Sequence, residues 1–320
     1  MSVALCLMLY GSVVATFGPP VLRRLTRRGA APRLGVFAWL VAIGGALGAW
    51  ALAAGMLIIE FATFWRHPAD SLLASYAVLS MPIHLHGDVA TGLGTLTLAT
   101  LVAVAILAAI VVMVLNACRA MLRLRRHTHA HGQAVRMVGR RVPGVGAVVL
   151  DSPERQAYCA PGRPDTIVVT SAALDALTRD QLAAVLAHEH AHLTGRHAAV
   201  IGFLRGIAAT LPGMRLVTDG VGEIGRLLEM CADDTAARSH GPEPLLGGLL
   251  AIVGASGPVP AGALGAAGTA VLARAERLVA PVGVVHRATN RTALVAVIAA
   301  TVIGLLEIAV GVLFCSTMLG

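Results

Sequence analysis

The chain has 320 residues, of which 57% are hydrophobic and only 13% are charged, and its mean hydropathy is +0.77. This composition excludes an ordinary soluble domain and a disordered chain, and it favours a membrane protein with the lipid bilayer as its partner. The net charge of +8 lies largely beside apolar segments, so we expect contact with anionic headgroups and no direct contact with nucleic acid.

Four apolar segments exceed the roughly 20 residues that a helix needs to cross a bilayer. Three carry no charge, and the last carries only Glu307. They are residues 2–22, 34–59, 89–118 and 292–317. The first could instead be a cleaved signal peptide, but its basic residues follow the apolar run, so we interpret it as a retained anchor. The sequence therefore predicts four transmembrane helices.

The placement of arginines predicts how these helices are oriented. Loop 23–33 holds five arginines and no acid, and a second basic stretch follows residue 118, which marks both as cytoplasmic. Loop 60–88 is net acidic and suits the outside. We expect three transmembrane helices within 1–118, a cytoplasmic domain over 119–291, and a fourth helix with a short outer tail over 292–320. Both termini then lie outside a bacterial cytoplasmic membrane.

The cytoplasmic domain begins with three short β-prone runs, at residues 146–150, 156–160 and 166–170, and continues as helices. This order predicts an α+β domain in which an edge strand could hold an extended substrate by β-augmentation. The apolar stretches 198–214 and 245–273 are interrupted by Arg, Pro or Gly, so we expect buried or membrane-surface helices there.

A capping box at Thr178 and Gln181 opens a helix that contains the pattern HExxH, from His188 to His192. Two imidazoles four residues apart share a helical face and can converge on one metal ion. Glu189 lies where a carboxylate can take a proton from a water that the metal activates. The pattern predicts a metal-dependent hydrolase, and a histidine-rich surface helix is the competing interpretation. We expect the apolar residues of this helix to form one buried stripe away from the histidine pair.

A catalytic zinc needs a third ligand. In the pattern HExxHxxGxxH this would be residue 198, which is alanine, and His197 misses the position by one. The other solution takes a glutamate from a later helix, and Glu229 supplies one. Asp233 shares its face and can accept a hydrogen bond from a ligand imidazole, although an exposed acidic patch would show the same spacing. His197 and His240 are weaker candidates for stabilising an oxyanion.

The HExxH helix followed by Glu229-Met230-Cys231-Ala232-Asp233 resembles the membrane gluzincin peptidases. That group includes the HtpX and CAAX prenyl-protease type and the BlaR/MecR-type antirepressor peptidases, and the likeness covers roughly residues 145–240. The resemblance implies Zn²⁺ held by His188, His192 and Glu229, with Glu189 as general base and Asp233 supporting a ligand. It further implies a zinc endopeptidase whose zincin-like domain lies between the third and fourth transmembrane helices.

Three spans before the domain and one after it resemble the BlaR/MecR arrangement, which implies a cytoplasmic transcriptional repressor as the protein substrate in a signalling pathway. The sequence ends at Gly320, so we expect no C-terminal sensor domain. Two alternatives stay open, namely quality control of membrane proteins as in the HtpX type, and a non-catalytic membrane sensor or scaffold. Gly44 and Gly48 form a GxxxG face, a candidate surface for homo-oligomers.

Overall fold

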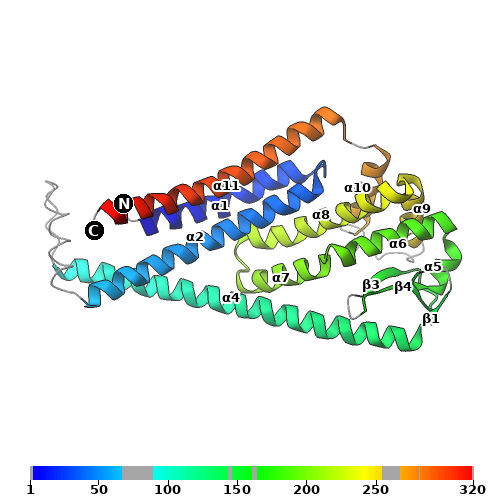
Figure 1. Cartoon of the computed structure of the whole chain (residues 1–320), viewed down its shortest axis with the longest axis horizontal. Coiled ribbons are helices and arrows are strands. Elements are labelled where there is room, and N and C mark those ends of the chain that lie inside the picture. Colours follow the sequence, from blue (N-terminus) through cyan, green and yellow to red (C-terminus); the bar gives the residue numbers. More distant parts are fainter. Residues whose placement is uncertain are drawn as a thin grey trace. The chain divides into compact units, whose positions relative to one another are not determined.

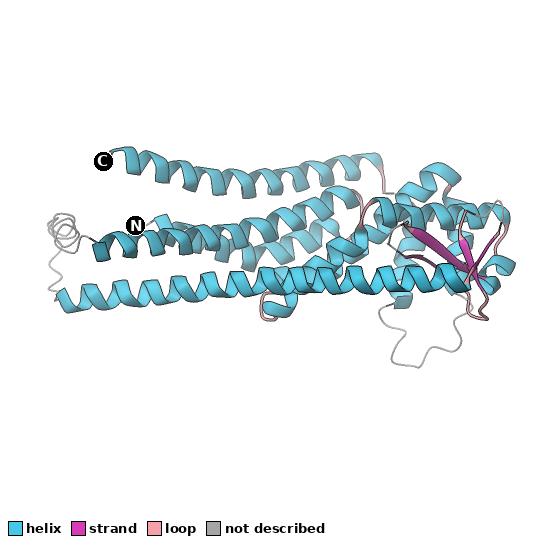
Figure 2. Cartoon of the chain, turned by 60° about the horizontal axis from the view of Figure 1, so that its bottom comes forward, coloured by secondary structure: helices cyan, strands magenta, loops and turns pink. Residues whose placement is uncertain are grey.

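The structure, a computed structural model, describes residues 3–66, 89–142, 146–160, 164–253, 267–280 and 282–318. It is mostly helical and contains one small mixed sheet (Figures 1 and 2). The chain forms two compact units. The first comprises residues 1–18, 40–115 and 298–320, and the second comprises 19–39 and 116–297.

Four of the described helices are long and apolar enough to cross a membrane. They are α1 (Val3–Thr26), α2 (Pro32–Arg66), α4 (Val89–Val138) and α11 (Val284–Met318). Each predicted span falls within one of these helices, except for its first residue in the case of span 2–22, which lies outside the described residues. Four apolar helices are consistent with a membrane protein. The helices are longer than the predicted spans. For example, α4 continues through the basic stretch after residue 118, where no proline interrupts it. Most of the loop over 60–88 lies outside the described residues.

The first unit packs through small side chains. Ala4 and Leu7 of α1 are buried against Ala49 and Ala53 of α2, which lets the two helices approach closely. The hydroxyl of Tyr10 donates a hydrogen bond to the backbone carbonyl of Thr301 in α11. A side chain added at Gly44 or Gly48 would meet no described atom within 4 Å, so the GxxxG face takes no part in this packing.

The second unit contains a four-stranded sheet. Its strands are β1 (Arg140–Arg141), β2 (Val148–Leu150), β3 (Ala157–Ala160) and β4 (Thr166–Thr170). The strand order is β1-β2-β4-β3, with β2 parallel to β4 and the other pairs antiparallel. The three predicted strands are confirmed to within two residues. Strand β1 was missed because two exposed arginines carry no alternating pattern, and only the pairing with β2 makes them a strand.

Six of the described helices lie wholly within this unit. They are α5 (Ser171–Ala176), α6 (Arg179–Thr194), α7 (His197–Thr210), α8 (Arg215–His240), α9 (Pro242–Val253) and α10 (Ala267–Val279). Helices α7 and α9 have 14 and 12 residues, so each is too short to cross a bilayer core. Residues 254–266 of the second apolar stretch lie outside the described residues. Figure 1 shows α6 beside α8, with the sheet next to α6.

Helix α6 lies between two layers of the second unit. On one side Leu182 and Leu186 pack against Val169 of the sheet. On the other, Ala184 packs against Ala236 of α8 and Leu245 of α9. The prediction of a buried stripe away from the histidine pair was wrong, because His188 itself lies on the buried face with Ala184, Val185 and Ala191, whereas Leu182 and Leu186 are only half-buried.

The connection between α1 and α2 docks on α8 and α10 within this unit. Arg226 donates to the carbonyl of Thr26 at 2.9 Å, and Arg277 donates to the carbonyl of Gly29 at 3.1 Å. Gly29 has a φ of +58°, and a side chain there would lie 2.3 Å from the sulfur of Met230. Glycine is therefore required at this close approach to α8.

Candidate metal centre

Helix α6 carries the first two candidate ligands. The predicted capping box is confirmed, since the backbone N–H of Gln181 donates to the Thr178 hydroxyl at 3.3 Å and the Thr178 N–H donates to the Gln181 side chain at 3.0 Å. Gly195 ends the helix, and its backbone N–H donates to the carbonyl of Ala191. Between these ends, His188 and His192 lie one turn apart on the same face, and His190 is exposed on another.

Helix α8 carries the carboxylates. Glu229 and Asp233 lie one turn apart on its side facing α6. Ala232 between them is fully buried, as the close approach of the two helices requires. Asp233 is also fully buried, whereas the Glu229 side chain keeps 42% of its exposure. The pair is therefore not an acidic surface patch, and solvent reaches the site on the Glu229 side.

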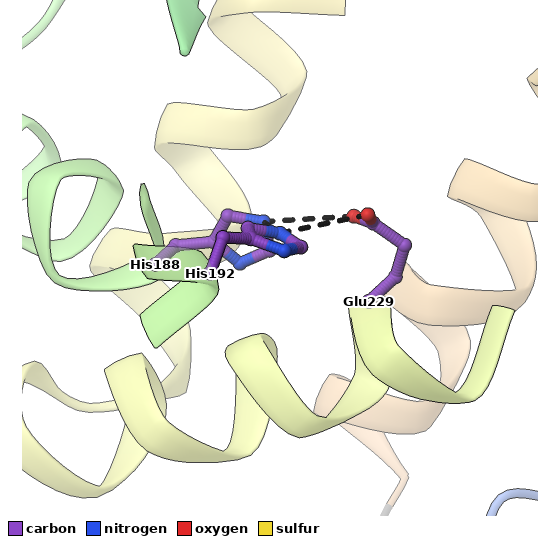
Figure 3. A group of neighbouring side chains, drawn as sticks. All are labelled: His188, His192 and Glu229. Atoms are coloured by element: carbon purple, nitrogen blue, oxygen red, sulfur yellow. Dashed lines mark hydrogen bonds and ion pairs between the residues drawn. The ribbon is translucent and has the colours of Figure 1, made fainter. Parts of the chain in front are cut away.

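The two imidazoles and the Glu229 carboxylate point toward one another (Figure 3). The Nε2 atoms of His188 and His192 are 3.1 Å apart. Nε2 of His188 lies 3.6 Å from Oε2 of Glu229, and Nε2 of His192 lies 3.5 Å from Oε1. Ligand atoms about 2.0–2.1 Å from one tetrahedral ion are about 3.3 Å apart. The three donors, all within 4.8 Å of one another, therefore fit a single metal ion.

The far side of the His188 ring faces a carboxylate. Nδ1 of His188 lies 3.1 Å from Oδ1 of Asp233, although its N–H is not well aligned for a hydrogen bond. This contact suits a ligand imidazole, which coordinates through one nitrogen and donates from the other. Arg274 of α10 forms ion pairs with both Glu229 and Asp233.

The far side of the His192 ring faces another histidine. Nδ1 of His192 lies 2.8 Å from Nδ1 of His197, at the start of α7. His197 is brought there by the tight turn at Arg196, which adopts a left-handed conformation with a φ of 50°. His197 therefore faces the back of a candidate ligand, whereas His240 is exposed at the end of α8.

The charges of the site favour a bound cation. Burial opposes ionisation of Glu229 and Asp233, but their contacts with His188, and that of Asp233 with Arg274, hold the pKa of each carboxyl below its usual range. Burial lowers the pKa of His188, yet its carboxylate partners outweigh burial and raise it to about 9. The metal-free site thus holds a proton where a cation would sit.

Glu189 lies in a different environment from the other carboxylates. Burial raises the pKa of Glu189 above its ordinary value, against the opposing effect of the two imidazoles. The backbone of Cys159 in β3 lies close enough to this side chain to favour its ionised form, which partly offsets the effect of burial on the pKa. A carboxylate with a raised pKa beside an edge strand is placed to exchange protons with whatever lies along that strand.

The two cysteines nearest to the site, Cys159 and Cys231, contribute no donor to it. Burial raises the pKa of Cys159 to about 12 and that of Cys231 to about 11, so both are protonated at neutral pH. Among the described residues, the three predicted donors form the one group of His, Cys, Asp or Glu side chains close enough to share an ion.

Two imidazoles and a carboxylate around one ion position, with a further carboxylate beside them, define the donor set of a metallohydrolase. The comparison with known families agrees, because residues 123–229 match the family model of peptidase family M48. This match covers about a third of the chain and supports a metallopeptidase of that family. No curated protein and no solved structure matches the chain.

Sequence reasoning placed the three donors and Asp233 but missed two neighbours. Arg274 directly follows the apolar stretch 245–273, and no local pattern links it to Asp233 forty-one residues earlier. His197 was weighed as a third ligand and as an oxyanion donor, but not as a partner of His192. Its spacing from His192, five residues across a helix end, was the signal that could have indicated a contact behind the ligand.

Proposed function

We propose that the protein is a zinc-dependent membrane endopeptidase. The observation that carries the proposal is the convergence of His188, His192 and Glu229, from two separate helices, at distances that fit one tetrahedral ion. The match to peptidase family M48 supports the same reaction class. Two imidazoles and one carboxylate form a donor set that zinc commonly takes in hydrolases.

The chain's residues divide the work of peptide hydrolysis. Zinc, when bound, supplies a Lewis acid that polarises a carbonyl and lowers the pKa of water toward about 7. His188, His192 and Glu229 hold the ion, and Asp233 orients the His188 ring. Glu189 takes a proton from the attacking water and returns it to the leaving amine, for which a raised pKa is suited.

We propose that the substrate binds along strand β3. This strand lies at the edge of the sheet, paired with β4, and it contacts α6. An extended peptide added alongside it would run past Glu189, because β3 packs on α6 and the backbone of Cys159 lies near that side chain. The reactants would thus be an extended protein segment and water.

We further propose a multi-pass protein of the bacterial cytoplasmic membrane with the catalytic domain in the cytoplasm and both termini outside. Four apolar helices and the arginine-rich loop 23–33 support this orientation. A cytoplasmic domain could cleave a transcriptional repressor, as the BlaR/MecR-like order of spans implies. Turnover of membrane proteins is the competing substrate class.

The test compares Glu189→Gln with His188→Ala in the full-length protein. We expect Glu189→Gln to keep about one zinc per chain and to lose cleavage, and His188→Ala to lose both, because only the second change removes a ligand. Metal analysis and a cleavage assay on proteins trapped by Glu189→Gln measure this. A trapped repressor or a trapped membrane protein identifies the substrate class. Equal cleavage by Glu189→Gln and the wild type would refute the role of Glu189.

A further inference from the structure

Arg274 of α10 touches the candidate metal centre from outside the segment that matches the peptidase family. Its Nε donates to Oδ2 of Asp233 at 2.7 Å, and its Nη2 donates to Oδ1 at 2.6 Å. Its Nη1 lies 3.2 Å from Oε2 of Glu229. All three guanidinium nitrogens therefore face the carboxylates of Asp233 and Glu229, and the arginine is 9% exposed.

Asp233 depends on this arginine. The Asp233 side chain is fully buried, and a buried carboxylate is strongly destabilising unless a hydrogen-bonded cation compensates its charge. The parallel bonds of Arg274 engage both oxygens and so fix the plane of the carboxylate. Oδ1, one of the two bound oxygens, is the atom that faces Nδ1 of His188 at 3.1 Å. The arginine thus determines where that oxygen lies.

Glu229 is held at one oxygen only. Arg274 faces Oε2, whereas Oε1 is directed at His192, 3.5 Å from its Nε2. Without Arg274, a half-exposed glutamate side chain would sample several rotamers and would lose that freedom only when a metal binds. The guanidinium also offsets one of the negative charges that Glu189, Glu229 and Asp233 bring to the site. The remaining charge matches a divalent cation.

We propose that Arg274 is a positioning residue of the metal centre. It holds Asp233 behind His188 and restrains the Glu229 carboxylate, so that the three donors converge before an ion binds. The inference rests on the proposed function insofar as these donors hold a metal. It adds a residue that acts through the ligands and does not itself reach the ion.

The same helix offers a matched control. Arg277 lies one turn further along α10 and pairs with Asp234, the neighbour of Asp233. It also donates to the carbonyl of Gly29. Arg274 and Arg277 therefore make similar ion pairs with adjacent residues of α8, but only Arg274 reaches the carboxylates at the candidate metal centre.

The experiment uses the full-length protein in detergent and compares wild type, Arg274→Gln, Arg274→Lys and Arg277→Gln. Zinc affinity is measured by competition with a chromophoric chelator, and ligand geometry by the visible absorption spectrum of the cobalt-substituted protein. We expect Arg274→Gln to weaken zinc binding by about 10–100-fold and to shift the cobalt spectrum. Arg277→Gln should lower thermal stability yet keep wild-type affinity and spectrum.

Arg274→Lys tests the positioning role if Arg274→Gln fails to fold. Lysine keeps a positive charge near Asp233 but cannot form the two parallel hydrogen bonds that arginine makes to this carboxylate. We expect it to bind zinc more weakly than wild type and to shift the cobalt spectrum. Wild-type affinity with an unshifted spectrum in Arg274→Lys would overturn the positioning role. Wild-type protein that binds no zinc would instead refute the proposed function, and wild-type protein that binds zinc without cleaving any trapped protein would refute the peptidase reaction alone.

Discussion

At the scale of single residues, each candidate histidine ligand has a partner behind it. His188 is backed by Asp233 and His192 by His197, through the ring nitrogen that points away from the shared donor position. The two partners differ in chemistry, since a carboxylate can only accept a proton whereas an imidazole accepts only when it is neutral. Burial and the neighbouring His192 charge lower the pKa of His197 to about 4, which keeps it neutral.

The contact predicts that His197 supports the metal through His192. His197→Ala removes the acceptor for the Nδ1 proton of His192, so zinc affinity should fall about tenfold or more. His197→Asn places an amide oxygen close to the former Nδ1 and should retain most of the affinity. His190→Ala, an exposed change on the same helix, serves as control. Chelator competition measures all three, and unchanged affinity in His197→Ala would contradict the role.

At the scale of elements, the features with local causes were predictable. The capping box and Gly195 bounded α6, and runs of β-branched residues marked β2 and β4. The spacing of Glu229 and Asp233 placed both on one face of α8. The features that were missed arise from contacts between distant segments. Strand β1 exists through its pairing with β2, and Arg274 reaches Asp233 only after α10 folds back on α8.

The capping box gives a prediction about α6 alone. Thr178 is exposed, so Thr178→Ala removes the cap without opening a cavity. We expect the free energy of unfolding to fall by about 1 kcal/mol, since the freed N–H of Gln181 loses its acceptor. Thr178→Ser keeps the hydroxyl and should stay near wild type. Denaturant unfolding of the metal-free protein measures the difference, and zinc stoichiometry should be the same in all three proteins.

At the scale of the whole molecule, metal binding and folding are linked through protonation. The raised pKa of His188, about 9, means that its contribution to stability is complete below its ordinary pKa of 6.5 and is lost as the pH rises through 9. The lowered pKa of His197 acts in the opposite direction, since its contribution is present above 6.5 and is lost as the pH falls toward 4. The combined contribution of these two groups to the stability of the metal-free protein is therefore largest near pH 6.5.

A divalent ion changes this profile because it replaces the proton on His188. We expect the unfolding midpoint of chelator-treated protein to fall between pH 6.5 and 9, while zinc-loaded protein stays level, so that the gain from zinc widens with pH. Thermal unfolding with and without zinc across this range measures the gap. In His188→Gln both the alkaline decline and the zinc-dependent gain should disappear. A gap that stays constant from pH 6.5 to 9 would contradict the linkage, because zinc would then bind without displacing a proton.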